Sequence, residues 1–443
     1  MDRVVGRPDI AQREGPSAGV SRPRIVIIGA GFGGLSAAKR LGKVAADVTV
    51  IDRRNHHLFQ PLLYQVATAA LSPADIAAPI RGILATQANT HVILGSVTGI
   101  DTAGRSVLIG NRRIPSDLLI FATGARENYF GHDEWAAVTS GLKTIEDATT
   151  MRRCILMAFE RAEDSDDEAE RRRLLTFVII GGGPTGVELA GALAELAKAA
   201  LARDFRHIDP TTARIILVEA GPRLLPSFPP KLSAVAARAL TRLGVELRLG
   251  TTVTRCDRGG AVLDDEGIES RTLIWAAGVA ASPAATWLGV GPGRGGRVVM
   301  TSDLSLPEHP EIFVIGDTAQ VEGPDGALPG VAPVAKQEGA YVARVIAARL
   351  AGKRPPARFR YRNLSNLATI GRKEAIVDFG RLRLTGRIAW LVWGLAHIYF
   401  LIGFRNRMAV AVDWLWSYLT YQRGARLITG QEMCAAPCPS EER

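Results

Sequence analysis

Residues 24–34 read R-I-V-I-I-G-A-G-F-G-G and contain the strongest structural signal in the chain. Arg24–Ile28 is rich in β-branched side chains and predicts a buried strand. The residues after the glycines, L-S-A-A-K-R-L-G-K-V, predict a helix, and D-V-T-V-I-D predicts a second strand that ends at Asp52. A strand, a glycine loop, a helix and a second strand in this order predict a βαβ unit that binds a dinucleotide.

Each of the three glycines in the G-x-G-x-x-G pattern has a separate structural role. Gly29 permits the tight turn, Gly31 lets the backbone approach a pyrophosphate, and Gly34 lets the helix pack closely on the strand. The free N–H groups at the start of the helix then attract the phosphates. Asp52 follows Gly29 by 23 residues and is placed to accept hydrogen bonds from ribose hydroxyls. A purely structural turn would not explain this acid.

The same arrangement returns at Thr176, where T-F-V-I-I leads into G-G-G-P-T-G at Gly181–Gly186 and a strand ends at Glu219. The spacing of 38 positions from Gly181 to Glu219 indicates an insertion between helix and strand. A carboxylate here repels a 2′-phosphate and favours NADH over NADPH, although the nearby Arg223 leaves NADPH open. Two dinucleotide sites indicate one resident flavin and one diffusing nicotinamide.

Three further predicted strands end in small residues, where a ligand can approach the backbone closely. They are L-L-I-F-A-T-G-A, ending at Ala125, L-I-W-A-A-G-V, ending at Val279, and E-I-F-V-I-G-D, ending at Asp317. The Asp317 carboxylate is placed to hold the ribityl chain of a flavin, and a plain strand cap is the alternative interpretation.

The charge and composition of the chain limit the classes of partner that it is expected to bind. The chain has 443 residues with 54 Lys and Arg against 44 Asp and Glu, a net charge of +10 that suits an anionic partner. The basic residues are scattered or terminal and match no nucleic-acid motif, so nucleic-acid binding is not expected. The N-terminus lacks the apolar core of a signal peptide, which predicts a cytoplasmic catalytic body.

The C-terminal region differs in composition from the rest. Residues 381–426 hold four of the seven tryptophans, three of the seven tyrosines, and seven arginines against one acid, Asp413. Aromatic, apolar helices flanked by arginines predict an interfacial, monotopic membrane anchor. A core helix or a dimer interface is the alternative. Residues 388–404 are short for a span, and without a bundle of spans a proton pump is not expected.

The cysteines exclude several redox chemistries. Cys154 and Cys256 are isolated, Cys434 and Cys438 lie in the terminal tail, and no C-x-x-C occurs. This argues against disulfide reductases and against sulfide:quinone reductases, whose cysteines act near the flavin. The seven histidines show no metal-ligand spacing, so no metal site is predicted.

Four stretches carry a resemblance to a known family. They are G-A-G-F-G-G-L-S-A-A, F-Q-P-L-L-Y-Q-V-A-T-A-A-L at 59–71, G-G-G-P-T-G-V-E-L-A-G at 181–191, and G-V-A-P-V-A-K-Q-E-G at 330–339. Over residues 22–430 the chain resembles the two-dinucleotide-binding-domain flavoproteins, and most of all the type II NADH dehydrogenases, which are single-subunit NADH:quinone oxidoreductases. The resemblance implies a non-covalent FAD, NADH on one flavin face, a quinone on the other, and a homodimer on the cytoplasmic face of the cell membrane.

The resemblance also implies an α/β fold with two Rossmann-like dinucleotide-binding domains, in which the NADH domain interrupts the FAD domain. The expected boundaries are 1–22 for a flexible tail, 23–145 and 296–380 for the FAD domain, 146–295 for the NADH domain, 381–430 for the membrane-associating helices, and 431–443 for a polar tail.

The residues of the site are assigned by the same resemblance. Glu188 would lie beside the nicotinamide and flavin, and Gln337 would line the quinone pocket. Considered alone, Glu188 could be only a charge near a helix N-terminus, and Gln337 only a buried amide that satisfies backbone groups. FAD would be held by Gly29, Gly31, Gly34, Asp52, Arg53, Thr123, Gly124 and Asp317; NADH by Gly181, Gly183, Thr185, Gly186, Glu219 and Gly278; and the quinone by Gln65, Ala332, Pro333, Lys336 and Gln337.

The expected reaction is transfer of two electrons from NADH through bound FAD to a membrane quinone. Rate acceleration would come from holding the rings in contact rather than from an activated nucleophile. Two alternatives remain open at this point. One is a soluble NADH-dependent reductase that feeds ferredoxin or rubredoxin, and the other is a flavoprotein that senses NADH.

Overall fold

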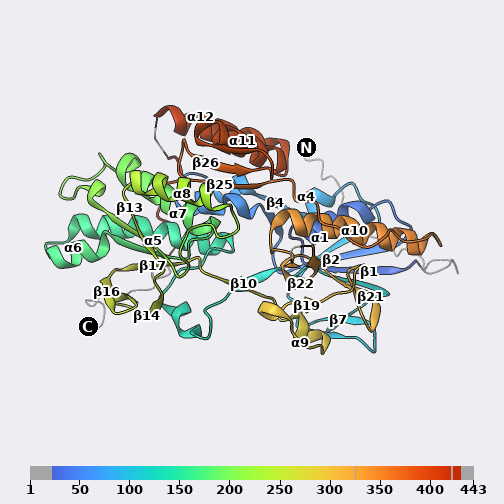
Figure 1. Ribbon diagram of the computed structural model, residues 1–443. Coiled ribbons are helices and arrows are strands. Elements are labelled where there is room, and N and C mark those ends of the chain that lie inside the picture. Colours follow the sequence, from blue (N-terminus) through green and yellow to red (C-terminus); the bar gives the residue numbers. More distant parts are fainter. Residues whose placement is uncertain (1–21, 325, 421–422, 431–443) are drawn as a thin grey trace, which may run out of the picture.

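The computed structural model describes residues 22–324, 326–420 and 423–430. The predicted tails, including Cys434 and Cys438, lie outside these ranges apart from Arg22 at the end of the first. Two α/β units lie side by side, and the C-terminal helices form a further layer above the second unit and its junction with the first (Figure 1).

The first unit contains a six-stranded sheet in the order β20-β21-β9-β1-β2-β5. All neighbouring strands are parallel except β20 and β21. Apolar side chains on both faces are buried, as expected for a parallel sheet covered by helices. The strands are β1 (Arg24–Ile28), β2 (Asp47–Asp52), β5 (Thr90–Leu94), β9 (Leu118–Phe121), β20 (Ser305–Leu306) and β21 (His309–Val314).

Two helices pack closely on this sheet, α1 (Phe32–Leu41) and α10 (Ala332–Leu350). A Cβ at Gly339 of α10 would collide with the carbonyl oxygen of Gly33 in α1, so only glycine permits this approach. The contact brings the A-K-Q-E-G segment, 300 residues later in the chain, beside the first glycine loop.

The second unit contains a four-stranded, fully parallel sheet in the order β13-β12-β11-β17. Its strands fall within residues 176–275, between β9 and β20 of the first sheet. The prediction that one dinucleotide-binding unit interrupts the other is therefore confirmed. The elements are β11 (Thr176–Ile180), β12 (Arg214–Glu219), β13 (Val245–Leu249) and β17 (Thr272–Trp275), with α5 (Ile145–Asp164), α7 (Pro184–Glu195) and α8 (Pro230–Arg242).

A two-stranded antiparallel ribbon links the units where the chain crosses between them. It pairs β10 (Ala125–Glu127) with β18 (Val279–Ala281). Each strand directly follows the end of a sheet strand, β9 or β17, so the ribbon begins at the edge where both glycine loops lie.

The segment 59–76 departs from its own unit. It contains α2 (Leu63–Ala67) and α3 (Pro73–Ile76). Its apolar side chains share one core with α5, α7 and the C-terminal elements rather than with the first sheet. This segment is therefore a structural bridge between the two halves of the molecule.

The C-terminal region contains a small sheet that the sequence did not reveal. Three antiparallel strands, β25 (Asn366–Thr369), β26 (Ala375–Asp378) and β27 (Arg383–Thr385), support α11 (Gly386–Phe400) and α12 (Phe404–Thr420). The boundary expected at residue 380 falls inside this sheet. The strands are only three or four residues long, too short for a clear alternating pattern.

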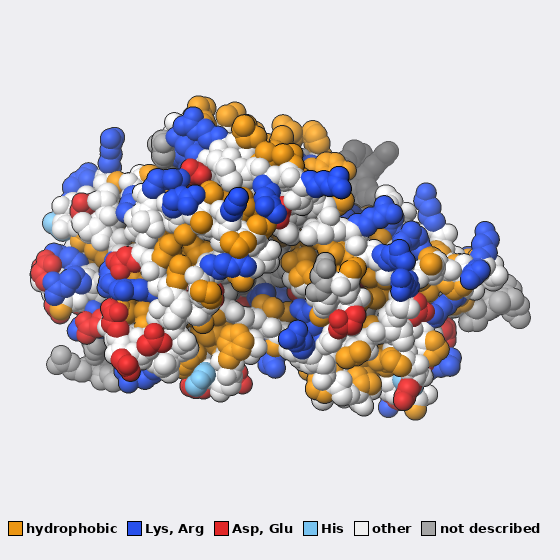
Figure 2. Space-filling model, viewed as in Figure 1, with side chains coloured by type: hydrophobic (Ala, Val, Ile, Leu, Met, Phe, Trp, Pro, Cys, Tyr) orange, Lys and Arg blue, Asp and Glu red, His pale blue; other side chains and the backbone are white. Residues whose placement is uncertain are grey.

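The two C-terminal helices do not reach across a bilayer. The 15 residues of α11 span about 22 Å, against about 30 Å of hydrocarbon, and none of the helices in the described ranges is long and apolar enough to span it. Their outward face is nevertheless apolar: Leu395 is 69 % exposed and Phe404 is 79 % exposed. Figure 2 shows these hydrophobic side chains gathered along the top, with lysines and arginines below them.

Candidate functional site

The first glycine loop has the shape of a phosphate cradle. Gly29 has φ +97°, and a Cβ there would collide with the carbonyl oxygen of Ala122 at the end of β9. A Cβ at Gly34 would collide with the carbonyl oxygen of Gly29. At Gly31 no heavy atom lies within 4 Å of the Cβ position, so a ligand can approach the backbone there.

The second glycine loop repeats this geometry. Gly181 has φ +113° and is crowded by the backbone of Ala276 and Ala277, and Gly186 is crowded by the Gly181 carbonyl. The Cβ position of Gly183 is open, and the first turn of α7 that follows it exposes Thr185. Both loops thus fit the pyrophosphate of a dinucleotide.

An acid is held beside each loop. Asp52 accepts hydrogen bonds from the backbone N–H of Ala30 at 2.6 Å and of Arg54 at 2.8 Å. Glu219 accepts from Gly182 and Gly221, both at 2.7 Å. Each carboxylate oxygen keeps a lone pair for a ribose hydroxyl, since an ionised carboxylate accepts about four hydrogen bonds.

The arginines near these acids are not equivalent. Arg223, which left NADPH open, donates to the carbonyls of Phe228 and Pro226 and to the hydroxyl of Ser233. Its guanidinium is therefore committed to the loop before α8. Arg53, expected to contact the cofactor, directly follows Asp52 and is exposed.

Most of the other predicted cofactor residues lie at the carboxyl ends of the sheet strands, where the glycine loops also lie. Parallel neighbouring strands bring their carboxyl ends together, so Thr123 and Gly124 after β9 and Asp317 after β21 lie beside the first loop. The Thr318 hydroxyl donates to the Gly124 carbonyl at 3.1 Å, which ties the two strand ends together. Gly278 follows β17, and the Phe130 ring occupies the position that its Cβ would need.

Glu338 is a buried acid that the sequence analysis missed. It is 1 % exposed, and its carboxylate accepts a hydrogen bond from the Gly316 N–H at 2.5 Å. Burial raises the pKa of Glu338 to about 8, against the opposing effect of that hydrogen bond. It therefore holds the turn that presents Asp317. The signal was an acid in helical register with the apolar residues Val334, Ala335 and Val342 of α10.

Glu188 lies in the second turn of α7. Desolvation raises its pKa to about 8, although a hydrogen bond from the Thr369 backbone favours the charged form. The carboxyl is therefore mostly neutral at pH 7. The negative charge of its ionised form raises the pKa of Tyr64 in α2. The G-V-E-L segment and the segment 59–76 therefore face the same small region.

Gln65 lies in a cavity beneath the C-terminal helices. Its amide accepts a hydrogen bond from the indole N–H of Trp414 at 2.8 Å and donates to the Tyr64 hydroxyl at 2.9 Å. The aromatic side of this cavity comes from α11 and α12. Its lining includes Tyr64, Gln65, Trp390, Trp393, Trp414 and Tyr418.

Gln337 does not line the cavity that contains Gln65. Its side-chain amide makes two hydrogen bonds with the backbone of Arg362, at 3.0 and 3.1 Å. The ammonium of the neighbouring Lys336 lies 4.8 Å from the centre of the Phe400 ring. Ala332 and Pro333 form the start of α10. The predicted quinone residues therefore meet the C-terminal helices at two places, through Lys336 at Phe400 and through Gln65 at Trp414.

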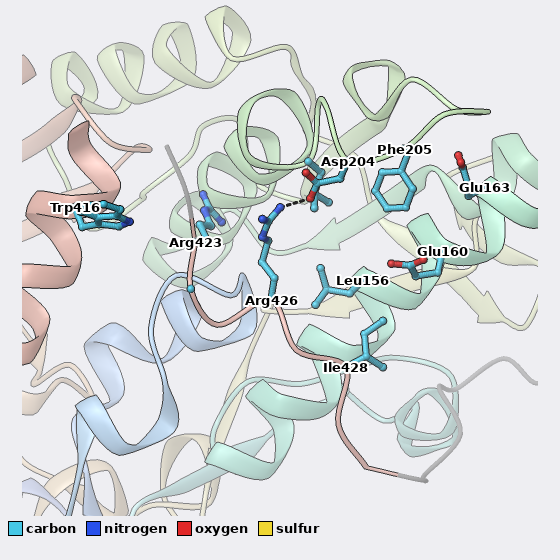
Figure 3. A pocket seen from close by; sticks show the side chains of 11 residues that line it. Leu156, Glu160, Glu163, Asp204, Phe205, Trp416, Arg423, Arg426 and Ile428 are labelled. Carbon is cyan, nitrogen blue, oxygen red and sulfur yellow. Dashed lines mark hydrogen bonds and ion pairs between the residues drawn. The ribbon is translucent and has the colours of Figure 1, made fainter. Parts of the chain in front are cut away.

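A buried arginine after α12 is a second feature that the sequence analysis missed. Arg423 is 7 % exposed and donates to the carbonyls of Thr68 at 2.6 Å and Ala192 at 3.0 Å. It also forms an ion pair with Glu195 at 3.7 Å. Figure 3 shows it near Arg426, which pairs with Asp204. These contacts fasten the end of the C-terminal region to α2 and α7.

The two cysteines in the described ranges are both buried, Cys154 in α5 and Cys256 in β14 (Val253–Asp257). Burial raises the pKa of Cys256 to about 12, which disfavours the reactive thiolate. Both belong to elements of the second unit rather than to the strand ends that form the first cradle.

Comparison with known proteins identifies the family. Residues 23–339 match the model described as pyridine nucleotide-disulphide oxidoreductase, and residues 364–422 match the NDH2 C-terminal domain. The chain is 46 % identical over 439 residues to the "Type II NADH:quinone oxidoreductase Ndh" of Mycobacterium tuberculosis, covering 96 % of this chain and 94 % of that protein. The chain belongs to the type II NADH:quinone oxidoreductases.

Other relatives of this family agree. A "Probable NADH dehydrogenase" of Dictyostelium discoideum is 30 % identical over 416 residues, with 92 % of each chain covered. In structure, NDH2 from Plasmodium falciparum superposes with a TM-score of 0.83 at 20 % identity, covering 92 % of this chain and all of that one. This last likeness shows that the two chains share a fold.

Proposed function

We propose that the protein oxidises NADH and reduces a membrane quinone, with FAD bound non-covalently at the first glycine loop. One observation carries the proposal. Two cradles of the same geometry, each with its own carboxylate, lie on neighbouring sheets that are linked by one ribbon. This is the arrangement that two dinucleotides need if their reactive rings are to meet between the units.

The chain's own residues supply binding and orientation. Asp52 and Glu219 accept from ribose hydroxyls, and the open backbone at Gly31 and Gly183 receives the pyrophosphates. Bound FAD would supply the two-electron chemistry. Glu188, with a pKa of about 8, can give and take a proton near neutral pH beside the rings.

The quinone would enter between α10 and the C-terminal helices. Ala332, Pro333 and Lys336 would border it on one side and Gln65 on the other, with Gln337 close to the flavin. In this proposal the Gln337 amide either exchanges its hydrogen bonds with the Arg362 backbone for a contact with the quinone, or keeps them while it borders the quinone. The aromatic lining beneath α11 and α12 suits an apolar ring.

We further propose that α11 and α12 dock on the cytoplasmic face of the cell membrane as a peripheral anchor, in a homodimer. The outward side chains of both helices support this, because they are apolar and strongly exposed. They form a continuous patch, whereas exposed apolar residues on most protein surfaces are scattered singly. Basic residues beneath them suit anionic headgroups. The exposed set is Ile388, Leu391, Leu395, Tyr399, Phe400, Phe404, Met408, Val412, Leu415, Trp416 and Leu419.

The test is NADH oxidation by the purified, flavin-loaded protein with a short-chain ubiquinone or menaquinone, and NADPH run in parallel. Fast turnover with NADH and quinone, and little with NADPH, supports the proposal. Flavin that NADH reduces but quinone cannot reoxidise would favour a reductase with a protein acceptor such as ferredoxin or rubredoxin. Slow turnover with every acceptor would favour an NADH sensor.

Deletion of the C-terminal helices would not separate these functions. Trp393 of α11 and Val410 of α12 are buried in the core, and Ala389 is fully buried beside them. Removing the helices would expose that core and destabilise the whole protein. Substitutions on the outer face of the helices are the appropriate variants.

A further inference from the structure

A chain of three hydrogen-bonding side chains connects α12 to α2. Trp414 Nε1 donates to Gln65 Oε1 at 2.8 Å, and Gln65 Nε2 donates to the Tyr64 hydroxyl oxygen at 2.9 Å. Tyr64 is 5 % exposed and Gln65 is 8 % exposed. Bulk water therefore competes poorly for these groups, and their mutual bonds fix their orientation.

The direction of this chain follows from its first member. An indole N–H can only donate, so the amide of Gln65 must turn its oxygen toward Trp414. The amide NH₂ group then faces Tyr64, and the hydroxyl oxygen of Tyr64 is the acceptor. In the part of the chain that the structure describes, this amide is the hydroxyl's one hydrogen-bond partner. The phenolic proton is therefore free for a ligand.

The surroundings of Tyr64 suit proton transfer to an apolar ring. Tyr64 lines the cavity formed with Trp390, Trp393 and Trp414. Desolvation, followed by the charge of Glu188, raises the pKa of Tyr64, so the hydroxyl keeps its proton until an acceptor is bound. The hydrogen bond from Gln65 and the Arg423 guanidinium oppose this shift, because both stabilise the deprotonated form. Arg423 would stabilise a tyrosinate that forms briefly, and Glu188 is the acid from which it can recover a proton.

We propose that Tyr64 is the catalytic residue that donates a proton to the quinone, and that Trp414 is the positioning residue that directs it. This inference rests on the proposed quinone reductase function. The O–H bond of Tyr64 breaks and an O–H bond forms on one quinone oxygen. Glu188 returns a proton to the tyrosinate and is reprotonated from water. The hydride of NADH accounts for both electrons and for the other proton, so NADH, one proton and quinone give NAD⁺ and quinol.

The decisive variant is Tyr64→Phe in the full-length, flavin-loaded protein. Stopped-flow absorbance measures flavin reduction by NADH and its reoxidation by a short-chain ubiquinone, separately and in both H₂O and D₂O. We expect reoxidation by quinone to slow about 100-fold, the lower end of what a positioned proton donor contributes. Reduction by NADH and turnover with ferricyanide, which takes up no proton, should stay within about twofold of wild type.

Trp414→Phe tests the positioning role. Without the indole donor, the Gln65 amide can reverse and accept the Tyr64 proton, so quinone reoxidation should slow while the quinone KM changes little. A matched control removes a similar group that has no hydrogen-bond partner in the described structure, the hydroxyl of Tyr341 in α10. Tyr341→Phe should keep the wild-type rate.

The outcomes separate the inference from the proposed function. If Tyr64→Phe is reoxidised by quinone at the wild-type rate and with the same solvent isotope effect, the role of Tyr64 is wrong while the quinone function stands. If quinone fails to reoxidise the wild-type protein, both are wrong. Flavin content and far-UV circular dichroism, compared with wild type, show that each variant is folded.

Discussion

Glu219 is the residue that we expect to discriminate between the nicotinamide cofactors. Its carboxylate is held by two backbone N–H groups at the edge of β12, where the ribose of a bound nucleotide lies in this fold. Since Arg223 is committed to another loop, the repulsion between the Glu219 carboxylate and a 2′-phosphate is not neutralised.

Replacing that carboxylate should therefore relax the preference. In Glu219→Gln we expect the ratio of kcat/KM for NADH over NADPH to fall about tenfold, because a charge pair at about 4 Å is worth ~1 kcal/mol in water and more where partly buried. Steady-state kinetics with both cofactors measure it. Glu246→Gln, on the neighbouring strand in an ion pair with Arg214, should leave the ratio unchanged. An unchanged ratio in Glu219→Gln would assign selection to another residue.

Two acids with raised pKa values should make stability depend on pH. The carboxyls of Glu188 and Glu338 have a pKa of about 8 in the folded protein, above the ordinary value of 4.5. The folded state binds these protons more tightly, so their contribution to stability is complete below pH 4.5 and is lost as pH rises through 8. We expect Tm to fall between pH 5 and 9, and to fall less in Glu338→Gln and in Glu188→Gln.

Differential scanning fluorimetry across that range checks this expectation. Glu338→Gln keeps an acceptor for the Gly316 N–H, whereas Glu338→Ala leaves that N–H unsatisfied at a cost of about 1–3 kcal/mol. The alanine variant should therefore lose stability at every pH. Equal pH slopes for wild type and both glutamine variants would contradict the prediction.

At the scale of elements, we expect the outer face of α11 and α12 to determine where the protein binds a membrane. Each large apolar side chain that leaves water contributes about 1.5–3 kcal/mol, so a row of them suffices to hold the protein at a bilayer. The inner face packs on the core through Trp393 and Val410 and is therefore a separate determinant of stability.

A double substitution on the outer face, Leu395→Glu with Phe404→Glu, should abolish sedimentation with vesicles of phosphatidylglycerol and phosphatidylethanolamine. Turnover with a short-chain quinone should remain, while turnover with a long-chain quinone in those vesicles should fall more than tenfold. Leu94→Glu, 60 % exposed on the first sheet, is the control and should bind as wild type. Vesicle binding by the double variant would place the membrane contact elsewhere.

The elements also show what the sequence could and could not predict. The strand–glycine–helix pattern predicted both cradles, because Gly29, Gly31 and Gly34 are required by backbone geometry that the motif encodes locally. The small sheet β25–β27 was missed because its strands carry too few residues for a pattern. The contact of Gln65 was missed because its partner, Trp414, lies 349 residues away in the chain. For Gln337 the alternative of an amide that satisfies backbone groups agrees with its hydrogen bonds to Arg362, although the sequence could not identify that partner.

At the scale of the whole molecule, Arg423 connects three parts of the chain. It ties the segment after α12 to α2, through Thr68, and to α7, through Ala192 and Glu195. We expect Arg423→Ala to lower the free energy of unfolding by about 3–5 kcal/mol, since it leaves a buried carboxylate and two carbonyls without their partner. Urea denaturation measures the change.

Arg426→Ala provides the matched comparison, because its ion pair with Asp204 is more exposed to water. Exposed pairs contribute about 0–1 kcal/mol, so this variant should unfold close to wild type. A similar loss for both variants would show that the segment is held as a unit rather than by Arg423.

The placement of segment 59–76 has a consequence for biosynthesis. This segment leaves the ribosome early, yet Thr68 receives its hydrogen bond from a residue 355 positions later, and Gln65 receives its own from Trp414. Contacts so distant in sequence form late and slow folding. The first cradle's strand β21 and helix α10 are also made after the second unit. The nascent chain can bury segment 59–76 against α5 and α7 once residues 145–195 are made. The polar groups of Gln65 and Thr68, however, lack their partners until translation is almost finished, and this interval is when chaperones are most needed.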